Sequence, residues 1–120
     1  MPSEPSVDQH RRQAQHNEDL LDQNVLPPDW EVTVRFYAVA HWVRAYLKKA
    51  LGVPSISSHA ETDKRLREAG IQTNIRQLFR TLRAASEDAR YYCVQPTPDV
   101  LDKMRKAHQR LRLFFEPKTR

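Results

Sequence analysis

The sequence has little glycine and little cysteine, with two glycines and one cysteine in 120 residues. Tight hairpin turns and Gly-rich phosphate loops both depend on glycine, so its scarcity argues against each of them. The lone Cys93 excludes an intramolecular disulfide and a zinc site built on cysteine pairs, and it fits a reducing cytoplasm. HExxH, CxxC and nucleophile-elbow motifs are also absent, and we therefore expect no metal and no cofactor.

Long apolar runs are absent as well. The most apolar stretch, residues 29–51, is interrupted by Glu31, Arg35, His41 and Arg44, which do not suit a membrane-spanning helix. The first residues are polar and lack the apolar core of a signal peptide. Together with the single cysteine, these features predict a cytoplasmic protein that does not enter a membrane.

Residues 29–51 predict the central helix of the fold. They contain no glycine and no proline, Asp29 is suited to cap the first turn, and Gly52 is suited to end the last one. Apolar residues at three- and four-residue steps form one face: Val32, Phe36, Val39, Val43, Leu47 and Ala50. Much of the opposite side is also apolar: Trp30, Val34, Ala38 and Ala45. A helix that is apolar on two sides is central or carries a partner surface, so a homodimer is expected.

The chain as a whole predicts an all-α fold, an up-and-down four-helix bundle with a short leading helix. Short connections between the helical segments favour antiparallel neighbours. The sequence predicts a disordered tail over 1–16, a helical domain over 17–116 and a short basic tail over 117–120. Within the domain it predicts a leading helix at 17–25 and a linker at 53–57. Further helices are predicted to start at Ser58, at Thr73 or Asn74, and at Thr97.

Positive charge is concentrated in the second half of the chain. The formal net charge is +5, and residues 76–120 carry 11 Lys/Arg against 5 Asp/Glu. Such an excess favours an anionic partner, which would be nucleic acid, a nucleotide or an acidic protein. A solvated, arginine-rich surface with no partner is the alternative interpretation.

Two histidines and several arginines are candidate site residues. His41 lies mid-helix, and Arg44 follows it by three residues. The same pattern also fits a histidine that has no role in a site and whose hydrogen bonds are satisfied by a side chain of a neighbouring helix. His59 follows the cap residue Ser58, where the positive helix end favours a neutral imidazole, and Arg65 on the same helix is a candidate partner. The remaining candidates for binding are the basic stripe Arg76, Arg80 and Arg83, and the pair Arg90 and Tyr91, which we expect to close a polar site against another helix.

Four segments, taken in chain order, resemble the HEPN superfamily of small helical domains. They are FYAVAH at 36–41, SH at 58–59, the helix at 82–91 with SEDARY at its end, and PDV at 98–100. The resemblance covers residues 29–115, most of the chain. It implies a four- or five-helix bundle that usually dimerises.

The resemblance also implies candidate functions. Many HEPN proteins are metal-independent ribonucleases of toxin–antitoxin or defence systems, while others pair with nucleotidyltransferases or only bind nucleotides or proteins. The nuclease motif of the family, an arginine and a polar residue followed by a histidine, resembles Arg35 and His41, with Phe36 in the polar position.

Three functions follow as hypotheses. The first is a module that binds RNA, a nucleotide or a protein, with an antitoxin or a nucleotidyltransferase as the expected protein partner. The second is a metal-independent endoribonuclease in which Arg35 and His41 are catalytic. The third is a structural helical adaptor.

Overall fold

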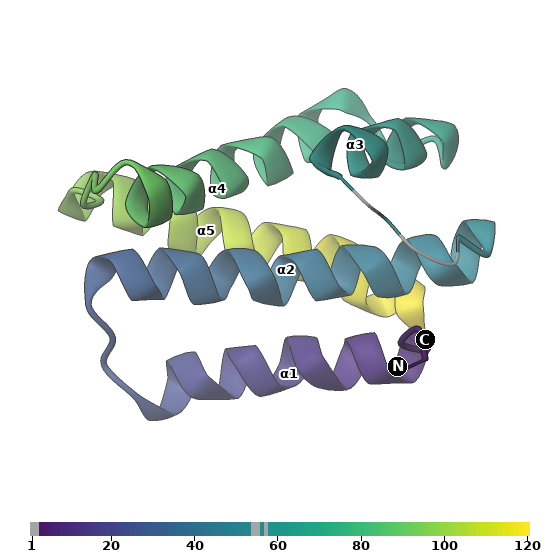
Figure 1. The fold of residues 1–120 in the computed structure, drawn as a ribbon, viewed down its shortest axis with the longest axis horizontal. Coiled ribbons are helices and arrows are strands. Elements are labelled where there is room, and N and C mark those ends of the chain that lie inside the picture. The colour runs from purple at the N-terminus through teal and green to yellow at the C-terminus, as the bar shows by residue number, and fades with distance from the viewer. Residues whose placement is uncertain (1–2, 54–55, 57) are drawn as a thin grey trace.

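The computed structural model describes residues 3–53, 56 and 58–120, so that residues 54, 55 and 57 of the predicted linker lie outside it. Within that part the chain forms five α-helices and one 3-10 helix, with no strand, which confirms the all-α prediction. The elements are α1 (Val7–Gln23), α2 (Pro28–Leu51), α3 (His59–Glu68), α4 (Thr73–Tyr91), α5 (Pro98–Phe115) and the 3-10 helix η1 (Glu116–Thr119). Figure 1 shows α1 and α2 antiparallel and side by side, with α4 and α5 on the other side of α2.

The helix α2 is the central element, as the sequence predicts, and it packs against α1, α4 and α5. Pro28 occupies the first helical position, where the fixed φ of proline suits a helix start, so Asp29 lies in the first turn and does not cap it. At the other end Gly52 adopts a left-handed φ of 65°, and its N–H donates to the carbonyl of Lys48. This geometry ends the helix where the sequence predicts.

Five of the six residues of the predicted apolar face of α2 lie in the core. Val32, Val39, Val43 and Leu47 are fully buried, and the Phe36 ring stacks on Phe79 of α4 with 5.8 Å between centroids. Two apolar residues of the prediction are instead exposed. Ala50 lies in the last turn, which extends past α1 in Figure 1, and Trp30 in the first turn keeps 59% of its surface exposed.

The prediction of a disordered tail is wrong for residues 7–16, which form the first part of α1. Ser6 caps this helix. Its hydroxyl oxygen accepts the N–H of Gln9, and the Gln9 side chain accepts the N–H of Ser6. α1 is therefore longer than the short leading helix expected over 17–25. It has few apolar residues, and the side chains that it buries include the polar His10 and Glu18, which hydrophobic periodicity does not detect.

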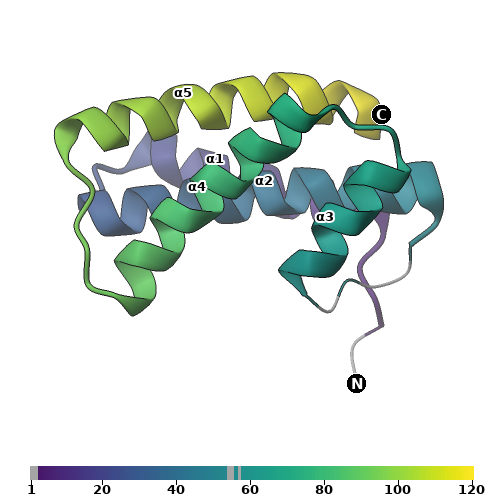
Figure 2. The ribbon, with the colours of Figure 1, turned by 90° about the horizontal axis from the view of Figure 1, so that it is seen from above.

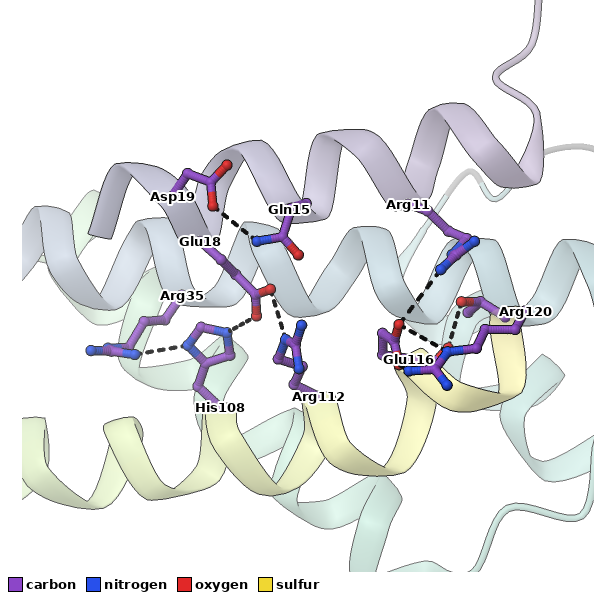
Figure 3. Close-up of polar contacts among 10 residues, drawn as sticks. Arg11, Gln15, Glu18, Asp19, Arg35, His108, Arg112, Glu116 and Arg120 are labelled. Atoms are coloured by element: carbon purple, nitrogen blue, oxygen red, sulfur yellow. Dashed lines mark hydrogen bonds and ion pairs between the residues drawn. The ribbon is translucent and has the colours of Figure 1, made fainter. Parts of the chain in front are cut away.

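Residues 117–119 belong to η1, although the sequence predicts a basic tail over 117–120. Thr119 in η1 is 2% exposed, and its hydroxyl donates to the carbonyl of Glu116 at 2.6 Å. The Glu116 carboxylate pairs with Arg120 at 3.1 Å and with Arg11 of α1 at 3.5 Å (Figure 3). The last turn of the chain is therefore tied to the first helix.

The helices α3 and α4 supply the walls of the site described below. Ser58 caps α3 by accepting the N–H of Glu61, as the sequence predicts, and Gly70 leaves the helix with a φ of 79°. Leu66 of α3 is buried against the core. Figure 2 shows α3 and the C-terminal end of α4 on the side of α2 that faces away from α5.

Candidate functional site

A cavity of about 410 Å³ lies where α2, α3 and α4 meet. Four of the predicted site residues line it, namely His41, His59, Arg90 and Tyr91. We call it the Arg90 cavity, and its described lining is completed by Phe36, Tyr37, Ala40, Arg44, Ile56, Ser58, Thr62 and Phe79. Arg90 and Tyr91, which we expected to close a polar site against another helix, both line this cavity, and Arg90 bonds to Tyr37 of α2.

Arg90 is held in place by neighbours from two helices. Its Nε donates to the Ser86 hydroxyl at 3.0 Å on α4, and its Nη1 donates to the Tyr37 hydroxyl of α2 at 2.7 Å and to the Tyr91 hydroxyl at 3.1 Å. Its guanidinium carbon lies 5.1 Å from the centre of the Tyr37 ring and 4.8 Å from that of Tyr91. The cation is thus fixed between two aromatic rings.

Neither arginine of the cavity is neutralised by an acid in the described part of the chain. Arg90 contacts hydroxyl groups, a carbonyl and rings, and Arg44 is exposed, with no ion pair or hydrogen bond to a described residue. Elsewhere arginines do have acidic partners: Arg35 pairs with Glu31, and Arg112 with Glu18. The Arg90 cavity therefore carries positive charge that an anionic ligand would neutralise.

His41 reaches the cavity from α2 and contacts a second histidine behind it. Its Nδ1 lies 3.0 Å from Nδ1 of His10 on α1, so one ring must donate to the unprotonated nitrogen of the other. Burial, followed by the charges of His10 and Arg44, lowers the pKa of His41 to about 4. His41 is therefore neutral near pH 7 and can accept a proton or a hydrogen bond.

His59 stands at the opposite wall, in the first turn of α3. Its Nε2 lies 3.6 Å from a carboxylate oxygen of Glu87, and its ring packs against Phe36 with 6.1 Å between centroids. Burial, followed by the charge of Arg83, lowers its pKa, which Glu87 only partly opposes. The cavity thus has an imidazole on each of two walls.

Arg35, the predicted catalytic partner of His41, lies outside this cavity and belongs to another cluster. Its Nε donates to Glu31 at 2.9 Å, and its Nη1 donates to Nδ1 of His108 on α5 at 2.8 Å (Figure 3). Six residues along a helix separate Arg35 and His41 by about 120° around its axis, so they face different neighbours. Within one chain the structure does not bring the predicted catalytic pair together.

The other predicted binding arginines are also placed outside the Arg90 cavity. Arg65 pairs with Glu68 at 3.0 Å and Glu61 at 3.7 Å on its own helix and does not line the cavity with His59. Arg76 bonds to the carbonyl of Ile71 at the junction of α3 and α4. Of the two other members of the stripe, Arg83 pairs with Glu87 at 3.4 Å, whereas Arg80 is half-buried and has no ion pair to a described residue.

Three residues of the site were not singled out from the sequence: Tyr37, Arg44 and His10. Tyr37 and Arg44 flank His41 at four and three residues, which places all three on one face of α2. That spacing was the available signal. His10 gave none, since it lies in the segment that the sequence predicts as disordered.

Among the described residues, no group of three or more His, Cys, Asp or Glu side chains is arranged to hold a metal ion. None of the described helices is long and apolar enough to span a bilayer.

Comparison of the chain with protein-family models, with curated proteins and with solved structures finds no match.

Proposed function

We propose that this chain is a HEPN-like helical bundle that binds RNA or a nucleotide in the Arg90 cavity. The observation that carries the proposal is the pair Arg44 and Arg90, two cations without an acidic partner among the described residues, in a cavity that Tyr37 and Tyr91 also line. The family resemblance of the sequence supports the same proposal.

The chemistry of a nucleotide matches what the cavity offers. A phosphate accepts several charge-assisted hydrogen bonds from a guanidinium, and a base stacks on an aromatic ring. Arg90 has its Nη2 without a protein partner in the described part of the chain, while its other nitrogens hold it still. A volume of about 410 Å³ lies within the ordinary range of small-ligand sites.

The proposal is tested by titrating the protein with a nucleoside 5′-monophosphate and with a short RNA at several salt concentrations. We expect affinity to fall as salt rises, because phosphate contacts release counterions. Arg44→Ala and Arg90→Ala should each weaken binding about tenfold or more, since a hydrogen bond to a charged group is worth ~1.5–3 kcal/mol.

Arg110→Ala is the matched control, because it removes an exposed arginine of α5. In Figure 2, α5 lies on the opposite side of α2 from α3 and the C-terminal end of α4, which line the Arg90 cavity. Equal losses for Arg110→Ala and Arg44→Ala would reduce the binding to the overall charge of the protein. Absence of any affinity for either ligand would refute the proposal and leave a protein partner or a structural adaptor.

A metal-independent ribonuclease is the second candidate, because His41 and His59 line one cavity. One imidazole would take the proton of a ribose 2′-hydroxyl, whose oxygen then bonds to the adjacent phosphorus. The bond from phosphorus to the 5′-oxygen breaks, and that oxygen takes a proton from the protonated form of the other imidazole or from water. Arg90 would face the charge that develops on the phosphoryl oxygens. This candidate replaces the predicted pair Arg35 and His41 with two histidines.

Labelled RNA incubated with the protein in EDTA tests this candidate. Cutting should be lost in both His41→Ala and His59→Ala while both variants still bind RNA. If the two variants cut as fast as the unaltered protein, the histidines are not catalytic.

The expected homodimer, and an antitoxin or nucleotidyltransferase partner, remain proposals that sedimentation and co-expression would test.

A further inference from the structure

Three cavities adjoin one another along a single face of α2. The Arg90 cavity shares His41, Arg44 and Ile56 with a cavity of about 210 Å³, and it shares Arg90 with one of about 190 Å³. The smaller cavities extend this face to Lys48 at one end and to Trp30 at the other.

The α2 residues that line the three cavities follow helical periodicity. Trp30, Tyr37, His41, Arg44 and Lys48 are separated by seven, four, three and four residues, which places them in one row. At 1.5 Å per residue this row is about 27 Å long. We call the row and its three cavities the α2 groove.

The walls of the α2 groove come from segments far apart in the sequence. His10 of α1 lines it near Lys48, His59 of α3 near its middle, and Arg90 of α4 towards Trp30. Figure 2 shows α3 and the C-terminal end of α4 on the same side of α2.

Aromatic rings and positive charges share this groove. Trp30, Tyr37 and Tyr91 are 59%, 41% and 67% exposed, so their rings are accessible to a ligand. The cations are Arg44, Arg90 and Lys48. Among the described lining residues, the acids are Asp29 and Glu4, one at each end.

We infer that the α2 groove binds a single strand of nucleic acid along its length, an inference that rests on the proposed function of the Arg90 cavity. The strand lays bases on Trp30 and on the rings of Tyr37 and Tyr91, and its phosphates meet Arg90, Arg44 and Lys48. Exposed rings interleaved with cations are what an unpaired strand requires. An acidic peptide would use the cations but leave the rings without a role, and a duplex hides its base faces from them.

The inference is tested with uridine oligonucleotides of one to twelve nucleotides, together with DNA strands and a duplex of matched length. At about 3.4 Å per stacked nucleotide, 27 Å corresponds to about eight nucleotides, and to fewer in an extended strand. Affinity should rise with length and level off at or below about eight nucleotides. A preference for RNA over DNA would identify the natural strand as RNA. Equal affinity for RNA and DNA would show that the groove does not recognise the 2′-hydroxyl. Either result supports the inference.

Substitutions at the two ends of the groove separate it from the Arg90 cavity. Trp30→Ala should weaken binding of the octanucleotide about tenfold. Lys48→Ala should reduce the salt dependence of octanucleotide binding by the amount expected for about one phosphate contact. Both variants should bind the mononucleotide as the unaltered protein does. The matched controls are Leu113→Ala and Lys103→Ala, exposed residues of α5 that lie outside the three cavities.

Fluorescence gives an independent readout, because Trp30 is exposed and the other tryptophan, Trp42, is 2% exposed. The octanucleotide should quench the emission of the unaltered protein but not that of Trp30→Phe.

Three outcomes would overturn the inference while leaving the proposed function intact. They are equal affinity for the mononucleotide and the octanucleotide, equal affinity for the single strand and the duplex, and no effect of Trp30→Ala on the octanucleotide. Competition by polyglutamate as strong as by the oligonucleotide would overturn it in favour of an acidic peptide. Binding of the octanucleotide that is unaffected by Arg90→Ala and by Arg44→Ala would instead contradict the proposed function.

Discussion

Nε2 of His108 lies 2.7 Å from the carboxylate of Glu18, and this contact joins the last helix to the first (Figure 3). Arg35 donates to the other nitrogen of the same ring, so the proton of the neutral imidazole sits on Nε2 and is donated to Glu18. Burial alone would raise the pKa of Glu18, but hydrogen bonds from His108 and Arg112 outweigh it and lower that pKa. Polar residues from three helices thus stabilise one another in the interior.

Glu18→Gln should lower the free energy of unfolding by about 2–3 kcal/mol. Removing one member of a buried ion pair leaves its partners without the charge that offsets their desolvation. Arg112 is partly exposed and becomes hydrated when Glu18 is replaced, so we expect a loss of unfolding free energy near the lower end of the range given above. Urea denaturation at neutral pH measures the loss. Asp22→Asn, at an exposed site one turn further along α1, should change stability by less than about 0.5 kcal/mol.

Stability should fall as the pH drops below neutrality, in part because of His41. Its pKa is lowered from 6.5 to about 4 by burial, so the unfolded chain binds a proton at a pH where the folded protein does not. Protonation of the unfolded state therefore favours unfolding between pH 6.5 and about 4. At ~1.4 kcal/mol per pH unit, the loss from this one group totals about 3 kcal/mol across that window.

Urea denaturation at a series of pH values between 4 and 7.5 measures this loss. His41→Gln should flatten the dependence on pH, because glutamine does not titrate. His16→Gln, at an exposed site on α1, should leave it unchanged. A slope that persists in His41→Gln at its full size would assign the effect to other groups.

Deletion of residues 1–16 should unfold the protein or destabilise it severely. The deleted segment contains Ala14, which is fully buried, and His10, which bonds to His41. It also contains the cap residue Ser6, whose loss alone costs about 1 kcal/mol. Deletion of residues 1–3 removes none of these contacts and is the control. Thermal unfolding followed by circular dichroism distinguishes the two, and equal melting temperatures would support the sequence-based prediction of a disordered tail.

Arg35→Ala and Arg44→Ala should have opposite consequences. Arg35 bonds to Glu31 and His108, so its removal should cost about 2–3 kcal/mol of stability and leave RNA affinity unchanged. Arg44 is exposed and has no such contacts in the described part of the chain, so its removal should weaken RNA binding and leave stability unchanged. Melting temperatures and binding titrations on the same two preparations test this. Loss of RNA affinity in Arg35→Ala without loss of stability would restore Arg35 as a site residue.

The sequence predicts most of the fold because local rules agree in its middle and end. The apolar period of α2, the Ser58 cap of α3 and the Thr97 cap of α5 each act within a few residues. α1 begins with a local signal, the capping box of Ser6 and Gln9, but it lacks the apolar period because it buries Glu18 and His10 beside partners that lie far away in the sequence. Such long-range polar pairing leaves no periodic signal.

The candidate site was predicted only in part, for a similar reason. His41, His59, Arg90 and Tyr91 were chosen from their local settings, and the fold brings them into one cavity. Arg35 has the spacing of a motif, but spacing along a helix does not show which neighbour a side chain meets. One of its two partners is His108, which follows it by 73 positions in the sequence.

The extensive pairing of α1 with α2 has a consequence for the order in which the molecule assembles. These two helices are consecutive, are joined by a short Pro-containing connection and are synthesised before α4 and α5. Contacts between neighbouring segments form quickly because little chain entropy is lost in closing a short loop. A nascent hairpin can therefore be in place on the ribosome before the residues of α4 and α5 are translated, and it then serves as the template onto which they dock.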